Sequence, residues 1–142
     1  RFSDPAVNTF SQKKAEKWKQ KSSIRFVGTR RVPVRPLAAI LDEHVPPATE
    51  IDLLTIDAEG YDLDVLRSND WRRYRPKVVI AETYGFDPAN PSRSDVYAFL
   101  HKRGYVFTAL CGPSVIFSLG SLLSGNTAAE SAGEAQGTTH DV

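Results

Sequence analysis

The sequence predicts an α/β domain in which buried parallel strands alternate with helices and an antiparallel β-hairpin ends the sheet. Two short runs, residues 51–56 and 77–82, are apolar on both faces, as is typical of parallel strands covered on both sides. A helical pattern follows each run. Two further β-rich runs, residues 105–111 and 115–119, are joined only by Gly112-Pro113-Ser114. This link is too short for a parallel crossover, so we expect an antiparallel hairpin.

The composition is that of an ordinary globular protein. The 142 residues are 41% hydrophobic and 25% charged, which suits one domain with a hydrophobic core and excludes the disordered and fibrous classes. The formal net charge of +1 gives no reason to expect nucleic acid or a membrane surface as partner. No segment reaches the ~18 apolar residues of a membrane span. Because the chain starts at Arg1 and has no methionine, we expect a fragment or a processed chain.

The single cysteine, Cys111, cannot form an internal disulfide, and it lies in an apolar strand-like run. We therefore expect a buried structural thiol. A reducing compartment fits this usage, and no charged-then-apolar signal sequence opens the chain. Both observations favour a cytoplasmic location.

The N-terminal third predicts mostly local elements. Residues 12–21 hold five lysines and only two apolar side chains, which favours a solvated helix after Ser11 as N-cap; a basic face for an acidic ligand is the alternative. Residues 24–34 are rich in β-branched and aromatic side chains, which predicts strands at 24–27 and 31–34. Pro36 begins a helix that Pro46-Pro47 ends, with His44 in its last turn in a structural role.

The remaining elements carry clear start and stop signals. Asp62 is expected to cap a helix that runs to about Asn69. Ser92 or Ser94 caps the next helix, and Gly104 ends it in the left-handed conformation. The loop at 83–91 is of a kind that forms the wall of an active site. Residues 121–142 lack aromatic side chains, which predicts a disordered tail after a folded part at 1–120.

Carboxylates follow the two buried strands. Asp57 and Glu59 come directly after residues 51–56, and Glu82 ends the run at 77–82. Neighbouring strands lie about 5 Å apart, and ligands of open α/β sheets bind at the carboxyl ends of the strands. We therefore expect Asp57 and Glu59 to face a pocket and Glu82 to line it. Gly60 suits a turn with an unusual backbone conformation or a close approach.

This stretch resembles the FkbM family of S-adenosylmethionine-dependent methyltransferases. The likeness rests on Ile51-Asp52-Leu53-Leu54-Thr55-Ile56-Asp57-Ala58-Glu59-Gly60, followed by Asp62-Leu63-Asp64-Val65-Leu66. It continues through Ser68-Asn69-Asp70-Trp71, Arg75-Pro76-Lys77-Val78-Val79-Ile80-Ala81-Glu82 and Gly104-Tyr105, and covers roughly residues 2 to 119. The glycine-rich loop that holds the cofactor after the first strand in such a family does not occur in this chain.

The resemblance implies the C-terminal half of a Rossmann-like class I methyltransferase sheet, with residues 1–120 as a partial domain. It implies S-adenosylmethionine as cofactor, with Asp57 and Gly60 near it. Separately, no His/Cys cluster has the spacing of metal ligands, so we assign no metal site. The acceptor it implies is a hydroxyl of a sugar, glycan or natural product, with Asp57, Glu59 and Glu82 as catalytic candidates and Glu82 as general base. We expect the chain alone to bind cofactor poorly and to be inactive.

Other interpretations of the same residues stay open. Asp57 and Glu82 would cap the following helices, and Glu59 would pair with an arginine, if the acids are structural. The chain would be a non-catalytic interaction domain if the cofactor half is lost, or a magnesium-dependent phosphoryl or sugar transferase if Asp57 and Glu59 hold the metal. An unpaired edge at 51–56 would favour a homodimer unless residues 24–34 cover it.

Overall fold

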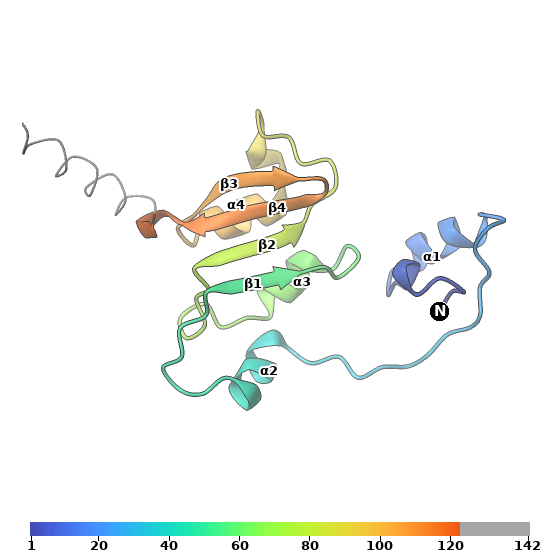
Figure 1. Cartoon of the computed structure of the whole chain (residues 1–142), viewed down its shortest axis with the longest axis horizontal. Helices are drawn as coiled ribbons and strands as arrows, with labels where there is room; N and C mark the ends of the chain where they lie inside the picture. Colours follow the sequence, from blue (N-terminus) through green and yellow to red (C-terminus); the bar gives the residue numbers. More distant parts are fainter. Residues whose placement is uncertain (123–142) are drawn as a thin grey trace, which may run out of the picture.

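The computed structural model describes residues 1–122, which form a mixed sheet with helices behind it and an N-terminal segment beside it (Figure 1). The elements in chain order are η1 (Pro5–Val7), α1 (Gln12–Lys19), α2 (Leu37–His44), β1 (Leu53–Ile56), α3 (Asp62–Arg67), β2 (Val78–Glu82), η2 (Pro91–Arg93), α4 (Asp95–His101), β3 (Tyr105–Cys111) and β4 (Ser114–Leu119). The predicted α/β class is confirmed.

The sheet has the strand order β1-β2-β4-β3. β1 and β2 are parallel, with Ile56 opposite Ala81 as their last pair. β4 is antiparallel to both β2 and β3, and β3 carries an irregularity between Phe107 and Ala109. The parallel pair brings the carboxyl ends of β1 and β2 to the same edge of the sheet, where both lead toward α1 in Figure 1.

The hydrophobic core lies between the sheet and the helices α3 and α4, which cover the same face (Figure 1). Fully buried side chains come from β2, β4 and both helices: Val79, Phe117, Val115, Leu66 and Leu100. Successive strand residues point to opposite faces, so alternate residues of β2 and β4 meet this layer. Trp71 packs edge-on against Phe99 and Tyr105 at centroid distances of 6.0 and 5.7 Å.

The prediction that the strand at 51–56 is covered on both faces is wrong for the described residues, whereas its expected unpaired edge is present. β1 is an edge strand, and Leu53 on its open face is 53% exposed. Thr55 on the same face is exposed too. An apolar run indicates that a strand is suited to burial on both faces. Burial of the second face also requires another layer of structure, and residues 1–122 do not form one over this face.

The predicted strands at 24–27 and 31–34 are also wrong. This segment runs as extended chain from α1 to α2 (Figure 1), and its only strand-like contact among the described residues is an isolated antiparallel bridge between Phe26 and Phe2. It does not pair with β1. β-branched residues favour extended backbone, but a strand also needs a neighbour for its hydrogen bonds. Farther on, α2 is fixed to α3 because Leu37 N–H donates to Ser68 Oγ at 3.0 Å.

Several helix ends follow the sequence signals. Ser11 Oγ accepts from Lys14 N–H at 3.3 Å, and Ser94 Oγ accepts from Tyr97 N–H at 3.2 Å, so both serines are N-caps. Gly104 has φ +83°, as predicted for the residue that ends α4. Asp62 is an exception, because Tyr61 occupies the N-cap position of α3 and Asp62 is its first helical residue.

The cysteine prediction is wrong as well, since Cys111 is exposed. It ends the edge strand β3 at the hairpin, where the residues from Thr108 to Cys111 are all exposed. At the chain end, residues 120–122 have helical backbone. The rest of the predicted disordered tail, residues 123–142, lies outside the described residues.

Candidate active site

The carboxyl edge of the β1–β2 pair places acids from two strands next to each other. Ile56 is paired with Ala81, so Asp57 and Glu82 are the next residue on each strand. Asp57 is exposed, and its carboxylate has no hydrogen-bond or ion-pair partner within residues 1–122. The sequence prediction that Asp57 and Glu82 meet at one edge agrees with this register.

The turn between β1 and α3 depends on two residues with left-handed backbone. Glu59 has φ +53° and Gly60 has φ +99°. Positive φ is uncommon for a non-glycine residue such as Glu59. Two consecutive residues with positive φ, one of them a glycine, turn the chain sharply toward the helix. A Cβ on Gly60 would lie at an ordinary contact distance of 3.5 Å from the Lys14 side chain, so the predicted unusual backbone conformation, rather than a close approach, accounts for the glycine.

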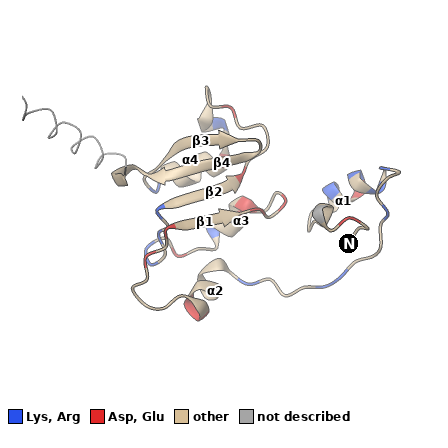
Figure 2. Cartoon of the chain, in the orientation of Figure 1, with Lys and Arg blue, Asp and Glu red and all other residues tan. Residues whose placement is uncertain are grey.

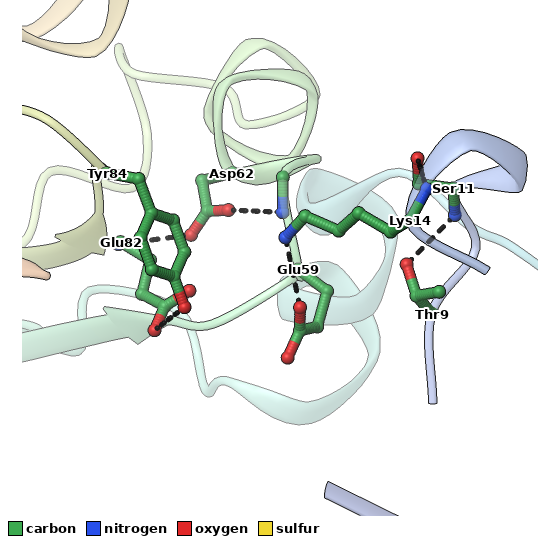
Figure 3. A network of polar contacts seen from close by, with 8 residues as sticks. Thr9, Ser11, Lys14, Glu59, Asp62, Glu82 and Tyr84 are labelled. Carbon is green, nitrogen blue, oxygen red and sulfur yellow. Dashed lines mark hydrogen bonds and ion pairs between the residues drawn. The ribbon is translucent and has the colours of Figure 1, made fainter. Parts of the chain in front are cut away.

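Asp62 joins this turn to β2. Its side chain is only 2% exposed; Oδ2 accepts from Gly60 N–H at 3.3 Å and Oδ1 accepts from Glu82 N–H at 3.2 Å (Figure 3). The carboxylate therefore fixes the end of β2 relative to the β1–α3 turn. Its position in the sequence predicted only a helix cap for Asp62. A better signal would have been an acid two residues after a glycine turn, since Asp side chains accept from nearby backbone N–H groups.

Glu82 has one carboxylate oxygen that accepts a hydrogen bond and one that does not. The Tyr84 hydroxyl donates to Oε1 at 3.3 Å, whereas Oε2 is buried without a hydrogen-bond partner in the described structure (Figure 3). Burial raises the pKa of the Glu82 carboxyl above its usual value, and the nearby negative charge of Asp57 raises it further. The hydrogen bond from Tyr84 acts in the opposite direction. A buried polar atom without a partner is rare in proteins and indicates a place for a ligand group or a water molecule.

Glu59 contacts the N-terminal helix. Its Oε2 lies 3.0 Å from Lys14 Nζ, and the two side chains are 28% and 31% exposed. The Lys14 ammonium also lies 5.3 Å from the centroid of the Tyr84 ring. A hollow of about 460 Å³ opens here, lined by Lys14, Lys17, Trp18, Glu59 and Tyr84. The active-site wall predicted at 83–91 therefore meets α1 across this hollow.

A second hollow of about 310 Å³ lies along the 83–91 loop. It is lined by residues of this loop and of the start of α4: Thr83, Tyr84, Gly85, Phe86, Asp87, Asn90, Arg93 and Ser94. Thr83 Oγ1 is buried without a hydrogen-bond partner, as Glu82 Oε2 is. The two neighbouring residues at the end of β2 thus both present unpaired oxygen atoms.

The structure tests part of the alternative interpretation in which the three acids have structural roles. The N-caps of α3 and of α4 are Tyr61 and Ser94, so neither Asp57 nor Glu82 caps the following helix. Glu59 does form an ion pair, but with a lysine from α1 rather than with an arginine. Sequence reasoning did not predict this partner, because Lys14 and Glu59 are 45 residues apart.

Charge is divided across the hollow. Lysine and arginine colour α1 in Figure 2, whereas acids colour the turn after β1 and the end of β2. Within residues 1–122, no group of three His, Cys, Asp or Glu side chains has the arrangement that would hold a metal ion. In the same part of the chain, no helix has the length and apolar character required to cross a bilayer.

Comparison with known proteins gives one assignment. Neither the curated proteins nor the solved structures gave a match. A family model described as the methyltransferase FkbM domain matches residues 3–107, which is most of the chain and includes α1, both acid-bearing strands and α4. The fold, the acids at the carboxyl edge of β1 and β2 and this match lead to one conclusion: the chain belongs to the FkbM family of methyltransferase domains.

Proposed function

We propose that the protein is an O-methyltransferase that uses S-adenosylmethionine, with Glu82 as the general base for an acceptor hydroxyl. The observation that carries this proposal is the buried, unpaired Oε2 of Glu82 at the carboxyl edge of the parallel strands. Burial raises the pKa of this carboxyl, which makes it a better proton acceptor than an exposed glutamate. An acceptor hydroxyl is a hydrogen-bond donor, and it would satisfy this atom.

The residues at this edge fit the positively charged end of the cofactor. S-adenosylmethionine, when bound, supplies a methyl group on a sulfonium that bears a positive charge. Asp57 contributes an unpaired carboxylate, and Glu82 stands beside it, so the edge favours a cation. Gly60 adopts its φ of +99° without strain, and because it has no Cβ its backbone is accessible to a bound group. Asp57 and Gly60 are therefore the residues we propose for the cofactor side.

The neighbouring side chains give Glu82 a fixed position. The Asp62 carboxylate accepts a hydrogen bond from the backbone N–H of Glu82, and the Tyr84 hydroxyl donates one to Oε1 of Glu82. Oε2 of Glu82 is therefore the atom that would take the proton. Correct placement of a base contributes about 10²–10⁴-fold to the rate of such a step. We infer that the sheet is the C-terminal half of a Rossmann-like class I methyltransferase sheet. No glycine-rich loop occurs in residues 1–142, so we also propose that this chain by itself binds the cofactor weakly.

The test is a product assay on the longest available polypeptide that contains these residues. Release of S-adenosylhomocysteine is measured with a panel of sugar, glycan and polyketide-type alcohols, for wild type, Glu82→Gln and Asp57→Asn. Glu16→Gln on the exposed side of α1 is the matched control. We expect Glu82→Gln to lower turnover about 10²-fold or more while it stays folded. Full turnover of Glu82→Gln would refute its role as base, and no turnover by any wild-type sample would support a non-catalytic domain.

A further inference from the structure

The hollow between α1 and the carboxyl edge has a mixed lining. One wall is the lysine-rich helix α1, and the other is formed by Glu59 and Tyr84. Its volume of about 460 Å³ lies within the range of about 300–1,000 Å³ that is usual for small-molecule sites. Glu59 lies in the turn that leads to Asp62, and the Tyr84 hydroxyl donates to Glu82, so the hollow adjoins the proposed base through Tyr84.

α1 presents one side to this hollow. Lys14, Lys17 and Trp18 are spaced i, i+3 and i+4, which places them on the same face of a helix. The ion pair between Lys14 and Glu59 fixes this face toward the sheet (Figure 3). Near it, the ring of Phe10 meets the ring of Tyr61 edge-on at 6.4 Å, a second attachment of the N-terminal segment to the α3 side.

Lys17 is a cation that forms no ion pair within residues 1–122. Residues 12–21 carry five lysines against the single acid Glu16, which pairs with Lys19 at 2.7 Å. Lys14 is paired with Glu59, but Lys17 has no acidic partner within residues 1–122, although it lines the hollow. A cation at the mouth of a small-molecule site attracts an anionic group. A solvated helix face alone does not account for Lys17 and Trp18 lining a cavity.

Two aromatic rings complete the lining. Trp18 is half-buried, and Tyr84 is 68% exposed with its hydroxyl turned to Glu82. Lys21 Nζ lies 4.6 Å from the Trp18 ring centroid, which adds a positive charge beside this ring. Aromatic side chains of this kind offer an apolar surface to a ring-shaped ligand and keep a polar tip for hydrogen bonding.

We propose that this hollow is the acceptor site, and that the acceptor is a ring compound that bears both the hydroxyl to be methylated and an anionic carboxylate, sulfate or phosphate group. Lys17 binds the anionic group, Trp18 and Tyr84 contact the ring, and the hydroxyl is directed to Glu82. The Lys14–Glu59 pair seats α1 and acts as a positioning contact. This inference rests on the proposed function and assigns its substrate class.

The test is a binding experiment that does not depend on methyl transfer. The 15N-labelled full chain is titrated with D-glucuronate, glucose 6-phosphate and 4-hydroxybenzoate, and each is compared with its neutral counterpart, glucose or 4-hydroxybenzyl alcohol. Amide shifts should move in α1, at Glu59 and at Tyr84, with tighter binding of at least one anion than of its counterpart. Lys17→Gln should weaken that binding about fivefold, and added salt should weaken it in wild type.

The matched control is Lys13→Gln, a lysine on the same helix that does not line the hollow. It should leave the affinity for the anion unchanged. Equal affinity for charged and neutral probes, or equal loss in Lys13→Gln and Lys17→Gln, would overturn the inference. Methyl transfer to neutral acceptors alone would also overturn it and leave the proposed function standing. Anion binding that depends on Lys17, with no turnover on any acceptor, charged or neutral, by the longest available polypeptide, would refute the proposed function instead.

Discussion

The buried Tyr105 phenol offers a quantitative test of the packing behind the site. Its side chain is fully buried, its hydroxyl donates to the carbonyl oxygen of Pro76, and its ring lies against Trp71. Pro76 stands two residues before β2, so this hydrogen bond helps to position the strand that ends in Glu82. Burial raises the pKa of Tyr105 from 10.0 to about 12, since the charged phenolate is disfavoured away from water.

The size and the sign of the effect follow from this shift. A group whose pKa is raised on folding contributes stability that is complete below its unfolded pKa and is lost as the pH rises through its folded pKa. The window is therefore from about pH 10 to about pH 12. Each pKa unit corresponds to about 1.4 kcal/mol, so wild type should lose about 2 kcal/mol from this group by about pH 11.5.

The perturbation is Tyr105→Phe, assayed by urea unfolding at about pH 8 and about pH 11.5 with far-ultraviolet circular dichroism. At the lower pH the variant should be less stable by about 1–3 kcal/mol, because the Pro76 carbonyl loses its donor. At the higher pH the difference should shrink by about 2 kcal/mol, since the variant has no phenol to ionise. Tyr61→Phe, at a phenol that is 38% exposed, controls for alkaline effects on the rest of the chain. Parallel loss of stability in wild type and Tyr105→Phe would refute the reasoning.

Three further predictions concern the site and the chain end. The raised pKa of Glu82 means that stability falls as the pH rises from about 4.5 through the folded pKa, so Glu82→Gln should be more stable than wild type at neutral pH but not at about pH 4. Thermal unfolding at the two pH values measures this, and a gain independent of pH would contradict it. Asp62→Ala should lower the free energy of unfolding by about 2–4 kcal/mol through two lost hydrogen bonds to a buried carboxylate, with a smaller loss in Asp62→Asn; equal stability of Asp62→Ala and wild type in urea would show that these bonds are unimportant. Removal of residues 123–142 should leave the melting temperature unchanged, because their composition offers no aromatic anchor, and a drop of several degrees in calorimetry would show otherwise.

The sequence by itself determined the features that depend on neighbours along the chain. The apolar runs at 51–56 and 77–82 predicted the parallel pair, and the acids that follow them predicted which edge of the sheet carries the carboxylates. The helix ends at Ser11, Ser94 and Gly104 were also predicted, because they too depend on residues close together in the chain. An N-cap or a left-handed turn is decided within three or four residues, so its signal is visible without knowledge of the fold.

Only the tertiary structure decided which of these residues meet. The bonds from Asp62 to Glu82 N–H and from Lys14 to Glu59 join parts of the chain 20 and 45 residues apart, and no spacing rule predicts such pairs. The tertiary structure also decided which strand edges are paired and which apolar faces are buried. Residues 24–34 have strand composition but no strand beside them, and Leu53 is apolar on a face that the described residues leave open. Local patterns record what a segment can bury or pair with, whereas the partners themselves are fixed by the packing of the whole chain.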